Sequence, residues 1–499
     1  MKARSIHLIG ICGTAMASLA GMLKLRGLDV RGSDSAAYPP MSTFLESLGI
    51  RVMQPFSEQN LEPAPDLVVV GNAISRGNPE LEYLLDRRIP FVSMPQVIHD
   101  EFIRGRNSLV IAGTHGKTTT TSMAAWIFEY AGRKPSFLVG GIAENFGSSF
   151  AVTDGAEFII EGDEYDTAFF DKGPKFLHYF PDAVILTSVE FDHADIYRDL
   201  EAVKFAFKRL VNLVPRRGKI IAWDGVPGEP ASGLPGRDGS VNVAECVERA
   251  FCPVERYGFG AESFWRIENV RYEPDATRWT VLREGKHFAD FEFALAGEYN
   301  VLNATAAAAL AHAYGIPAET TAGALRGFLS VKRRLEIRAE VDGITVIDDF
   351  AHHPTAIGAT LQALRGRYAG RRLWAILEPR SNTLRRNVFQ RELVESLSRA
   401  DQVIVASVFF KSNDVLGPSE RLDVERVVSE LNARGTAAQQ LADVDAIVSE
   451  VAARAASGDV LAILSNGGFG GIYEKLPAAL EASRPGKSNR SFARDPGQS

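Results

Sequence analysis

A glycine-rich turn that ends in Gly-Lys-Thr-Thr constrains this chain more than any other stretch. The turn occupies residues 113–119 and follows a short apolar segment, residues 108–112, that is typical of a buried strand. Residues 123–128 come after it with a helical pattern. Glycines allow backbone amides to turn toward an anion, and the positive end of a helix dipole strengthens the attraction. The order of strand, glycine turn, lysine and helix therefore predicts a phosphate-binding loop.

The loop carries the side chains that nucleotide binding requires. Lys117 is placed to reach the outer phosphates, and the Thr118 hydroxyl suits a magnesium ion. The loop is shorter than the common phosphate-binding pattern, because Ile111 stands where that pattern has its first glycine. A purely structural turn is the alternative. We expect ATP to bind through the whole loop, which comprises Gly113, Thr114, His115, Gly116, Lys117, Thr118 and Thr119.

Size and composition are those of a globular protein of about three domains, since the chain has 499 residues and 45% of them are hydrophobic. Its net charge of −7 argues against a nucleic acid or an anionic membrane as partner. The three cysteines form neither a disulfide framework nor a metal-binding spacing. The first apolar segment is too short for a signal sequence, and no apolar run reaches membrane-spanning length. We therefore expect a cytoplasmic protein.

The N-terminal stretch predicts a Rossmann-like domain. Residues 6–9 are a strand candidate, a glycine turn leads into a helical run, and a second strand ends at an aspartate. An acidic residue at about this distance from the turn is typical of dinucleotide folds, but the third glycine of their fingerprint is missing. A plain α/β turn is the alternative. We expect a nucleotide diphosphate at the helix start, bound by Gly10, Gly13, Thr14 and Asp34.

Two polar segments follow strand candidates in the central part of the chain. Residues 161–166 contain several carboxylates and are flanked on both sides by apolar residues. Carboxylates in such a setting repel one another unless a cation lies among them. Magnesium is the natural cation beside a triphosphate, and Glu161 is the leading candidate ligand. His193 follows the strand candidate at residues 184–186, and we expect it to contact a metal or a phosphate. A structural histidine is the alternative.

Further along, Asn300 and Asn303 lie three residues apart at the start of an alanine-rich helix, so they share one of its faces. Their side-chain amides are suited either to hydrogen bonds with the edge of an adenine base or to capping the helix. Alternating patterns around Trp279 and Phe291 predict a small antiparallel sheet. Residues 224–240, rich in Gly, Pro and Asp, predict a surface insertion.

A third domain begins near residue 330 and is again predicted to be α/β, with its site at strand ends. Arg334 offers a guanidinium for a phosphate, and residues 465–471 form another glycine-rich turn. The last residues are rich in Ser, Arg, Pro and Gly, and this composition predicts disorder. The predicted organisation is three domains and a disordered tail, at residues 1–107, 108–329, 330–483 and 484–499.

These motifs, taken in order, resemble the Mur ligase family, whose ATP-dependent enzymes build the peptide of bacterial cell-wall precursors. The resemblance rests on separated motifs across nearly the whole chain, at residues 113–119, 161, 192–193, 297–303, 333–334 and 349–354. It implies a Rossmann-like UDP-sugar domain, a central P-loop ATPase-type domain and a Rossmann-like C-terminal domain for the acceptor. It also implies that Lys117, Glu161, His193 and Arg334 are catalytic.

The resemblance implies a site assembled from two domains. Thr118, Glu161 and His193 would hold magnesium, and Asn300 and Asp349 would contact adenosine. Because these residues come from both the central and the C-terminal domain, the site would be complete only when the two domains meet.

The resemblance also implies a reaction: a carboxylate of UDP-N-acetylmuramate attacks the γ-phosphate of ATP, and an amine then captures the acyl phosphate. The segments at residues 378–383 and 465–471 resemble the branch that joins this substrate to the tripeptide L-alanyl-γ-D-glutamyl-meso-diaminopimelate in cell-wall peptide recycling. L-Alanine is the alternative acceptor. Arg380 is the residue we expect to hold a carboxylate of the peptide. Two alternative functions come from other functional classes: a binding protein without turnover and a kinase.

One position departs from the pattern of several family members, which carry a carbamylated lysine as a metal bridge on the helix after the histidine. Phe207 stands at the equivalent place, and Lys204 lies one turn earlier. We therefore expect no modified lysine here.

Overall fold

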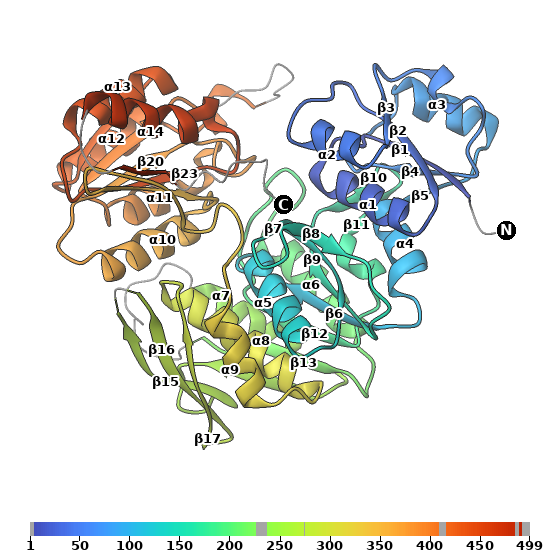
Figure 1. Ribbon diagram of the computed structural model, residues 1–499, viewed down its shortest axis with the longest axis horizontal. Helices are drawn as coiled ribbons and strands as arrows, with labels where there is room; N and C mark the ends of the chain where they lie inside the picture. The colour runs from blue at the N-terminus through green and yellow to red at the C-terminus, as the bar shows by residue number, and fades with distance from the viewer. Residues whose placement is uncertain (1–3, 226–236, 274, 409–415, 485–488, 492–499) are drawn as a thin grey trace.

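The computed structural model consists of three α/β lobes, each built on one main sheet (Figure 1). The N-terminal lobe is blue in Figure 1, the central lobe runs from cyan to yellow, and the C-terminal lobe is orange and red. The α/β class with three domains is thereby confirmed, while the domain boundaries stay a prediction. The structure describes residues 4–225, 237–273, 275–408, 416–484 and 489–491.

The N-terminal lobe has a five-stranded, all-parallel sheet in the order β3-β2-β1-β4-β5. The valine-rich strand β4 lies between β1 and β5 and its three valines are buried, as expected for a parallel strand with helices on both faces. The strands are β1 Ser5–Ile9, β2 Asp29–Ser33, β3 Arg51–Met53, β4 Leu67–Val70 and β5 Phe91–Ser93. The helices are α1 Thr14–Leu25, α2 Met41–Ser47, η1 Glu58–Leu61, α3 Pro79–Arg87, α4 Met94–Ile98 and η2 His99–Ile103.

The central lobe has a ten-stranded sheet in the order β17-β16-β15-β14-β13-β12-β6-β9-β7-β8. Its strands are β6 Asn107–Ala112, β7 Ser136–Ala143, β8 Ser148–Ala151, β9 Glu157–Gly162, β12 Ala183–Leu186, β13 Lys219–Trp223, β14 Val254–Gly258, β15 Trp265–Tyr272, β16 Thr277–Arg283 and β17 Lys286–Phe293. A separate hairpin pairs β10 Asp166–Ala168 with β11 Asp171–Pro174. The helices are α5 Lys117–Tyr130, η3 Lys175–His178, α6 Leu200–Leu213, α7 Arg237–Val247, α8 Glu298–Ala313 and α9 Ala318–Arg326.

Two sequence expectations for this lobe concern its antiparallel strands and its surface insertion. The antiparallel strands β15, β16 and β17 do not form a sheet of their own, because β15 pairs with β14 and so extends the parallel sheet. Pairing between strands depends on distant contacts, which local alternation does not report. Most of the predicted insertion, residues 226–236, lies outside the described residues, and α7 begins at Arg237.

The C-terminal lobe has a seven-stranded sheet in the order β22-β21-β20-β23-β19-β18-β24. Its strands are β18 Glu336–Val341, β19 Ile344–Asp349, β20 Leu373–Leu377, β21 Gln402–Ala406, β22 Ala437–Leu441, β23 Val460–Leu464 and β24 Asn489–Ser491. Its helices are α10 Pro354–Arg367, η4 Asn387–Phe389, α11 Gln390–Leu397, η5 Pro418–Glu420, α12 Val424–Ala433, α13 Val444–Arg454, η6 Phe469–Gly471 and α14 Ile472–Ser483.

The predicted disorder of the tail is not met at residues 489–491, because β24 pairs antiparallel with the edge strand β18. An unpaired strand edge offers backbone hydrogen bonds to any extended segment nearby, whatever its composition. The rest of the predicted tail after Arg484, residues 485–488 and 492–499, lies outside the described residues.

One apolar cluster joins one face of the N-terminal sheet to one face of the central sheet, and separate clusters cover the other face of each. The C-terminal sheet has its own cluster on each face. Helix α1 packs so closely on the central lobe that a Cβ at Gly21 would lie 2.7 Å from the ring of Phe150. Among the described helices, none combines the length and the hydropathy needed to cross a bilayer.

Candidate active site

The phosphate-binding loop connects β6 to α5, as its sequence predicts. Gly113 and Gly116 both have left-handed backbone conformations, with φ of 134° and 81°. A Cβ at Gly113 would lie 2.1 Å from the Thr187 hydroxyl, and one at Gly116 would lie 2.6 Å from Asn303 Oδ1. Both positions therefore require glycine for backbone freedom and for space. The His115 amide donates to Ser188 Oγ at 3.0 Å, which ties the loop to the end of the neighbouring strand β12.

Lys117 begins helix α5 and points back over the loop. Its Nζ donates to the Gly113 carbonyl at 2.6 Å and to Glu164 at 2.8 Å and 3.1 Å. Burial alone would lower the pKa of Lys117, but the carboxylates of Glu164 and Asp163 outweigh it and raise the pKa above its ordinary value. The lysine is therefore held charged in a site that largely excludes water.

Glu161 lies at the end of β9, next to the first turn of α5. Its Oε1 accepts from the Thr118 hydroxyl at 2.9 Å, and its Oε2 accepts from the Gly140 amide at 2.7 Å. The predicted pair of magnesium ligands, Thr118 and Glu161, is thus brought together. A hydroxyl and a carboxylate are hard oxygen donors of the kind that Mg²⁺ prefers.

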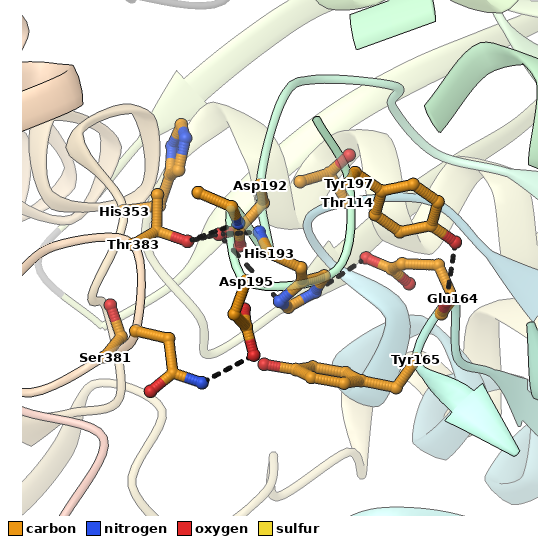
Figure 2. Close-up of polar contacts among 12 residues, drawn as sticks. Thr114, Glu164, Tyr165, Asp192, His193, Asp195, Tyr197, His353, Ser381 and Thr383 are labelled. Carbon is orange, nitrogen blue, oxygen red and sulfur yellow. Dashed lines mark hydrogen bonds and ion pairs between the residues drawn. The ribbon is translucent and has the colours of Figure 1, made fainter. Parts of the chain in front are cut away.

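His193 lies in the loop after β12 and has a left-handed backbone, with φ of 55°. Its Nε2 lies 3.1 Å from Glu164 Oε1, and its ring packs on Tyr165 with centroids 4.0 Å apart (Figure 2). Burial lowers the pKa of His193, but its hydrogen bond with Glu164 outweighs this and raises it. Glu164, which links His193 to Lys117, is a site residue that sequence reasoning did not single out from the neighbouring carboxylates. Strand periodicity gives no signal for it, because it follows the end of β9.

The predicted metal ligands do not all contact one another. Glu161 contacts Thr118, whereas His193 contacts Glu164. Within the described ranges, the one compact group of three potential metal-binding side chains is a different one: His115, Glu190 and His353, whose ligand atoms lie within 4.8 Å of one another. Ligand atoms around a tetrahedral ion at about 2.0 Å lie roughly 3.3 Å apart, so this group is wider than a preformed ion site.

The His115, Glu190 and His353 group is a contact between the central and C-terminal lobes. Glu190 accepts from the Thr355 hydroxyl at 2.7 Å, and the His115 and His353 rings pack at a tilt of 48° with centroids 4.8 Å apart. Burial would raise the pKa of Glu190, but the two histidines and the Thr355 hydroxyl outweigh it and hold the pKa at about 2. The phosphate-binding loop is therefore tied directly to the C-terminal lobe.

The residues expected to contact adenosine lie on both sides of the same junction, and their side chains have protein partners. Asn300 is buried and donates to the Ala296 carbonyl at 2.7 Å. Asp349 is buried, and it accepts from the amides of Leu335 and Ala351 at 2.8 Å and 2.9 Å. Burial raises the pKa of Asp349. The adenosine role of both residues stays a prediction.

The two arginines of the linker into the C-terminal lobe differ in their contacts. The guanidinium of Arg334 lies over the ring of Phe350 at 5.1 Å. That of Arg333 pairs with Asp348 at 3.1 Å, a contact within the C-terminal lobe. Three residues of this linker, Ser330, Arg333 and Leu335, have positive φ without being glycine. The linker conformation is therefore imposed by its surroundings, since non-glycine residues seldom adopt it unaided.

The N-terminal residues predicted to bind a nucleotide diphosphate lie at the start of α1. Gly10 has φ of 83°, and its amide donates to the Ser33 carbonyl at 2.8 Å. Asp34 Oδ2 accepts from the Cys12 amide at 2.8 Å, so its carboxylate braces the turn. Gly13 and Thr14 line a cavity of about 120 Å³ between the N-terminal and central lobes. Its other lining residues are Ala15, Met16, Asn72, Met94, Thr167 and Lys175.

Arg380 lies in the loop after β20, and its Nη1 donates to Glu378 Oε1 at 3.3 Å. The glycine-rich turn after β23 lies against it, since a Cβ at Gly467 would come within 2.3 Å of Arg380 Cδ. The side chain of Arg380 is about one-third exposed. The structure thus brings together two segments that the sequence singled out separately.

The expectation of no modified lysine concerns two positions on helix α6, which follows His193, and it stays a prediction. Phe207 on α6 is fully buried and packs against Phe176. Lys204 pairs instead with Glu201 and Glu245, at 2.7 Å and 2.6 Å. The Lys204 amine is therefore engaged by these two carboxylates.

Comparison with known proteins covers all three lobes. Three family models match this chain: "Mur ligase family, catalytic domain" at residues 5–104, "Mur ligase middle domain" at residues 111–311 and "Mur ligase, glutamate ligase domain" at residues 333–467. Their order and extent follow the three sheets of the structure.

Similarity to individual proteins extends over nearly the full length. The UDP-N-acetylmuramate–L-alanyl-γ-D-glutamyl-meso-2,6-diaminoheptandioate ligase of Escherichia coli K12 is 43% identical over 94% of this chain and 97% of its own. A UDP-N-acetylmuramate–L-alanine ligase of Acidithiobacillus ferrooxidans is 32% identical over 95% of this chain and 97% of its own. The crystal structure of a murein peptide ligase from Psychrobacter arcticus, 36% identical, has a TM-score of 0.69 and covers 95% of this chain and 98% of its own. This chain therefore belongs to the Mur ligase family.

Proposed function

We propose that this protein is an ATP-dependent ligase that joins UDP-N-acetylmuramate to the tripeptide L-alanyl-γ-D-glutamyl-meso-2,6-diaminoheptanedioate. The observation that carries the proposal is the full-length similarity to the Escherichia coli ligase of that name, at 43% identity, against 32% for an alanine-adding ligase over the same extent. Ligases of this family form carbon–nitrogen bonds at the expense of ATP. We propose that the enzyme acts in the cytoplasm, in recycling of the cell-wall peptide.

The chemistry that the site favours is activation of an acid by phosphoryl transfer. A carboxylate oxygen of the sugar attacks the γ-phosphorus of ATP, ADP leaves, and the terminal amine of the tripeptide then displaces phosphate from the acyl carbon. Because this needs no nucleophile from the enzyme, the work of the protein is to position the substrates and to neutralise their charge. Lys117 supplies a buried positive charge at the loop, and we propose Arg334 as a second cation for the γ-phosphate.

The donor set of the loop fits a magnesium ion. Thr118 and Glu161 offer a hydroxyl and a carboxylate already within 2.9 Å of each other. We propose that they hold the ion on the ATP phosphates and that His193 contributes to a second ion. The bound ions would neutralise phosphate charge during the transfer. The chain itself binds and orients the reactants through the loop amides, Lys117 and the Glu164 carboxylate that fixes the lysine.

We propose that the UDP part of the sugar nucleotide binds at Gly10, Gly13, Thr14 and Asp34, where the α1 N-terminus faces the cavity between the first two lobes. Lys175, which lines the same cavity from the central lobe, adds a cation that the sequence alone did not indicate. For the acceptor, we propose that Arg380 holds a carboxylate of the tripeptide, since a guanidinium binds carboxylates bidentately.

The product decides between this function and its alternatives. The protein is incubated with ATP, Mg²⁺, UDP-N-acetylmuramate and equimolar tripeptide and L-alanine, and the products are identified by mass spectrometry. We expect the mass of the tripeptide adduct, with one ADP formed per amide. An alanine adduct alone would establish the alternative acceptor, and a phosphorylated sugar without an amide would establish a kinase.

A further inference from the structure

The loop that carries Arg380 is bonded to the loop that carries His193. The first loop, residues 378–386, follows β20 in the C-terminal lobe, and the second, residues 189–197, follows β12 in the central lobe. Figure 2 shows Ser381 and Thr383 on one side of the junction, with Asp192, His193 and Asp195 on the other. The proposed acceptor side and the proposed phosphate side of the site thus meet through these two loops.

The central bond of the junction joins Thr383 and Asp192. The Thr383 hydroxyl donates to Asp192 Oδ1 at 2.7 Å and accepts from the Ala194 amide at 3.4 Å. Asp192 Oδ1 also accepts from the His193 amide at 2.7 Å. Both Thr383 and Asp192 are buried, at 3% and 7% exposure. A hydroxyl that donates to a buried carboxylate makes one of the stronger hydrogen bonds in proteins.

A second bond lies at the rim. Asn382 Nδ2 donates to Asp195 Oδ2 at 2.7 Å, and Asn382 Oδ1 accepts from Arg385 at 3.0 Å. The turn that presents both side chains is fixed within its own lobe, because the Leu384 amide donates to Ser381 Oγ at 3.0 Å. Thr383 and Asn382 are therefore presented side by side on this turn, and both contact the His193 loop.

The bonds continue from this junction to the phosphate-binding loop. Asp192 holds the His193 backbone in its left-handed conformation, the His193 ring contacts Glu164, and Glu164 pairs with Lys117. Since a non-glycine residue with positive φ needs support from its surroundings, the position of His193 depends on the contacts of Asp192. An unbroken set of short contacts thus joins the Arg380 loop to Lys117.

We propose that Thr383 and Asn382 are positioning residues that couple the acceptor loop to the phosphate site. Docking of this pair on Asp192 and Asp195 sets the position of His193, and through Glu164 that of Lys117. The phosphoryl-transfer site is then complete only while the acceptor loop is in place. The inference rests on the proposed ligase function, and it assigns to the two side chains a role in kcat rather than in binding of ATP.

The direct test replaces the Thr383 hydroxyl. Thr383→Val keeps the shape of the side chain but removes the donor to Asp192, whereas Thr383→Ser keeps the donor. We expect Thr383→Val to lower kcat for amide formation about tenfold or more, with KM for ATP within about twofold of wild type. Thr383→Ser should stay within about threefold of wild-type kcat. The melting temperature of each variant reports whether a loss of activity reflects loss of fold.

A second test exchanges the rim pair. Asn382→Asp places two carboxylates face to face, and we expect kcat to fall about fivefold. Asp195→Asn in the same chain supplies a donor to the new carboxylate, and we expect kcat to return to within about twofold of wild type. Arg367→Ala is the matched control, because Arg367 donates to the Ala294 carbonyl at 3.1 Å across the same two lobes but away from the His193 loop. It should leave kcat unchanged.

The outcomes separate this inference from the proposed function. If the wild-type protein makes no tripeptide adduct, the proposed function fails. If the wild type is active but Thr383→Val retains full kcat, or the exchanged pair stays as slow as Asn382→Asp alone, the coupling role is wrong. A rise in KM for ATP with unchanged kcat would also overturn it, because it would assign the contact to binding.

Discussion

Replacing Glu164 by Gln should destabilise the central lobe, because this carboxylate is the charge partner of Lys117. Glu164 is 2% exposed and Lys117 12% exposed, so solvent screens their contact little. The lysine would keep its bond to the Gly113 carbonyl at 2.6 Å and could still meet the amide oxygen, but the compensating negative charge would be gone. A buried cation that loses its partner is costly.

The size of the effect follows from this geometry. Removing one member of a buried ion pair costs about 3–5 kcal/mol, and the contacts that Lys117 retains reduce this to roughly 2–4 kcal/mol. For a domain of about 200 residues, such a loss lowers the melting temperature by about 4–16 °C. The same change should lower the pKa of His193, since Glu164 is the main group that raises it.

Differential scanning calorimetry of wild type, Glu164→Gln, Lys117→Met and the double variant measures the effect and its coupling. The double variant should lose less stability than the sum of the single variants, because each single change leaves a buried charge unpaired. Titration of the His193 ring by NMR gives an independent reading. Unchanged melting of Glu164→Gln, or strictly additive losses, would refute the idea that this pair anchors the loop.

Three further predictions concern the substrates. Gly116→Ala, which forces a side chain into a backbone with φ of 81° and against Asn303, should weaken ATP binding at least about tenfold by calorimetry; wild-type affinity would contradict the tight loop. Gly467→Ala should displace the Arg380 guanidinium and raise KM for the tripeptide about tenfold with KM for ATP unchanged, and an unchanged tripeptide KM would remove Arg380 from the acceptor site. Excess EDTA should abolish amide synthesis and added Mg²⁺ should restore it, whereas persisting activity would exclude a metal requirement.

The sequence predicts the phosphate-binding loop well because its determinants are local. Gly113 and Gly116 are needed for backbone conformations within a few residues, and the strand and helix on either side have clear patterns. The same holds for the turn around Gly10. Short-range signals of this kind can be recognised in the sequence without knowledge of the fold.

The partner of Lys117 could not be predicted, because it depends on how strands pair. Glu164 reaches Lys117 because β9 lies next to β6 in the sheet. No local sequence pattern specifies this pairing of strands. Asp163, two residues from Glu161, pairs instead with Lys175 at 2.6 Å. Neighbouring carboxylates in one acidic segment therefore have different partners.

The resemblance implied that the central and C-terminal domains meet at the site, but the particular bonds between them were beyond sequence reasoning for a similar reason. Asp192 and Thr383 lie 191 residues apart, and their bond requires two domains to meet at their strand ends. The sequence placed both segments after strands, which is where sites form in α/β sheets. It gave no indication that the two would contact each other.

This site activates an acid, we propose, by transferring a phosphoryl group from ATP to it. Labelling the muramate carboxylate of the sugar nucleotide with ¹⁸O tests this most directly, with mass spectrometry of the phosphate released during amide formation. We expect each phosphate to carry one labelled oxygen, because the carboxylate oxygen that attacks phosphorus leaves with the phosphate when the amine displaces it. Amide formation with unlabelled phosphate would contradict an acyl phosphate, and with it the role proposed for the loop at Lys117.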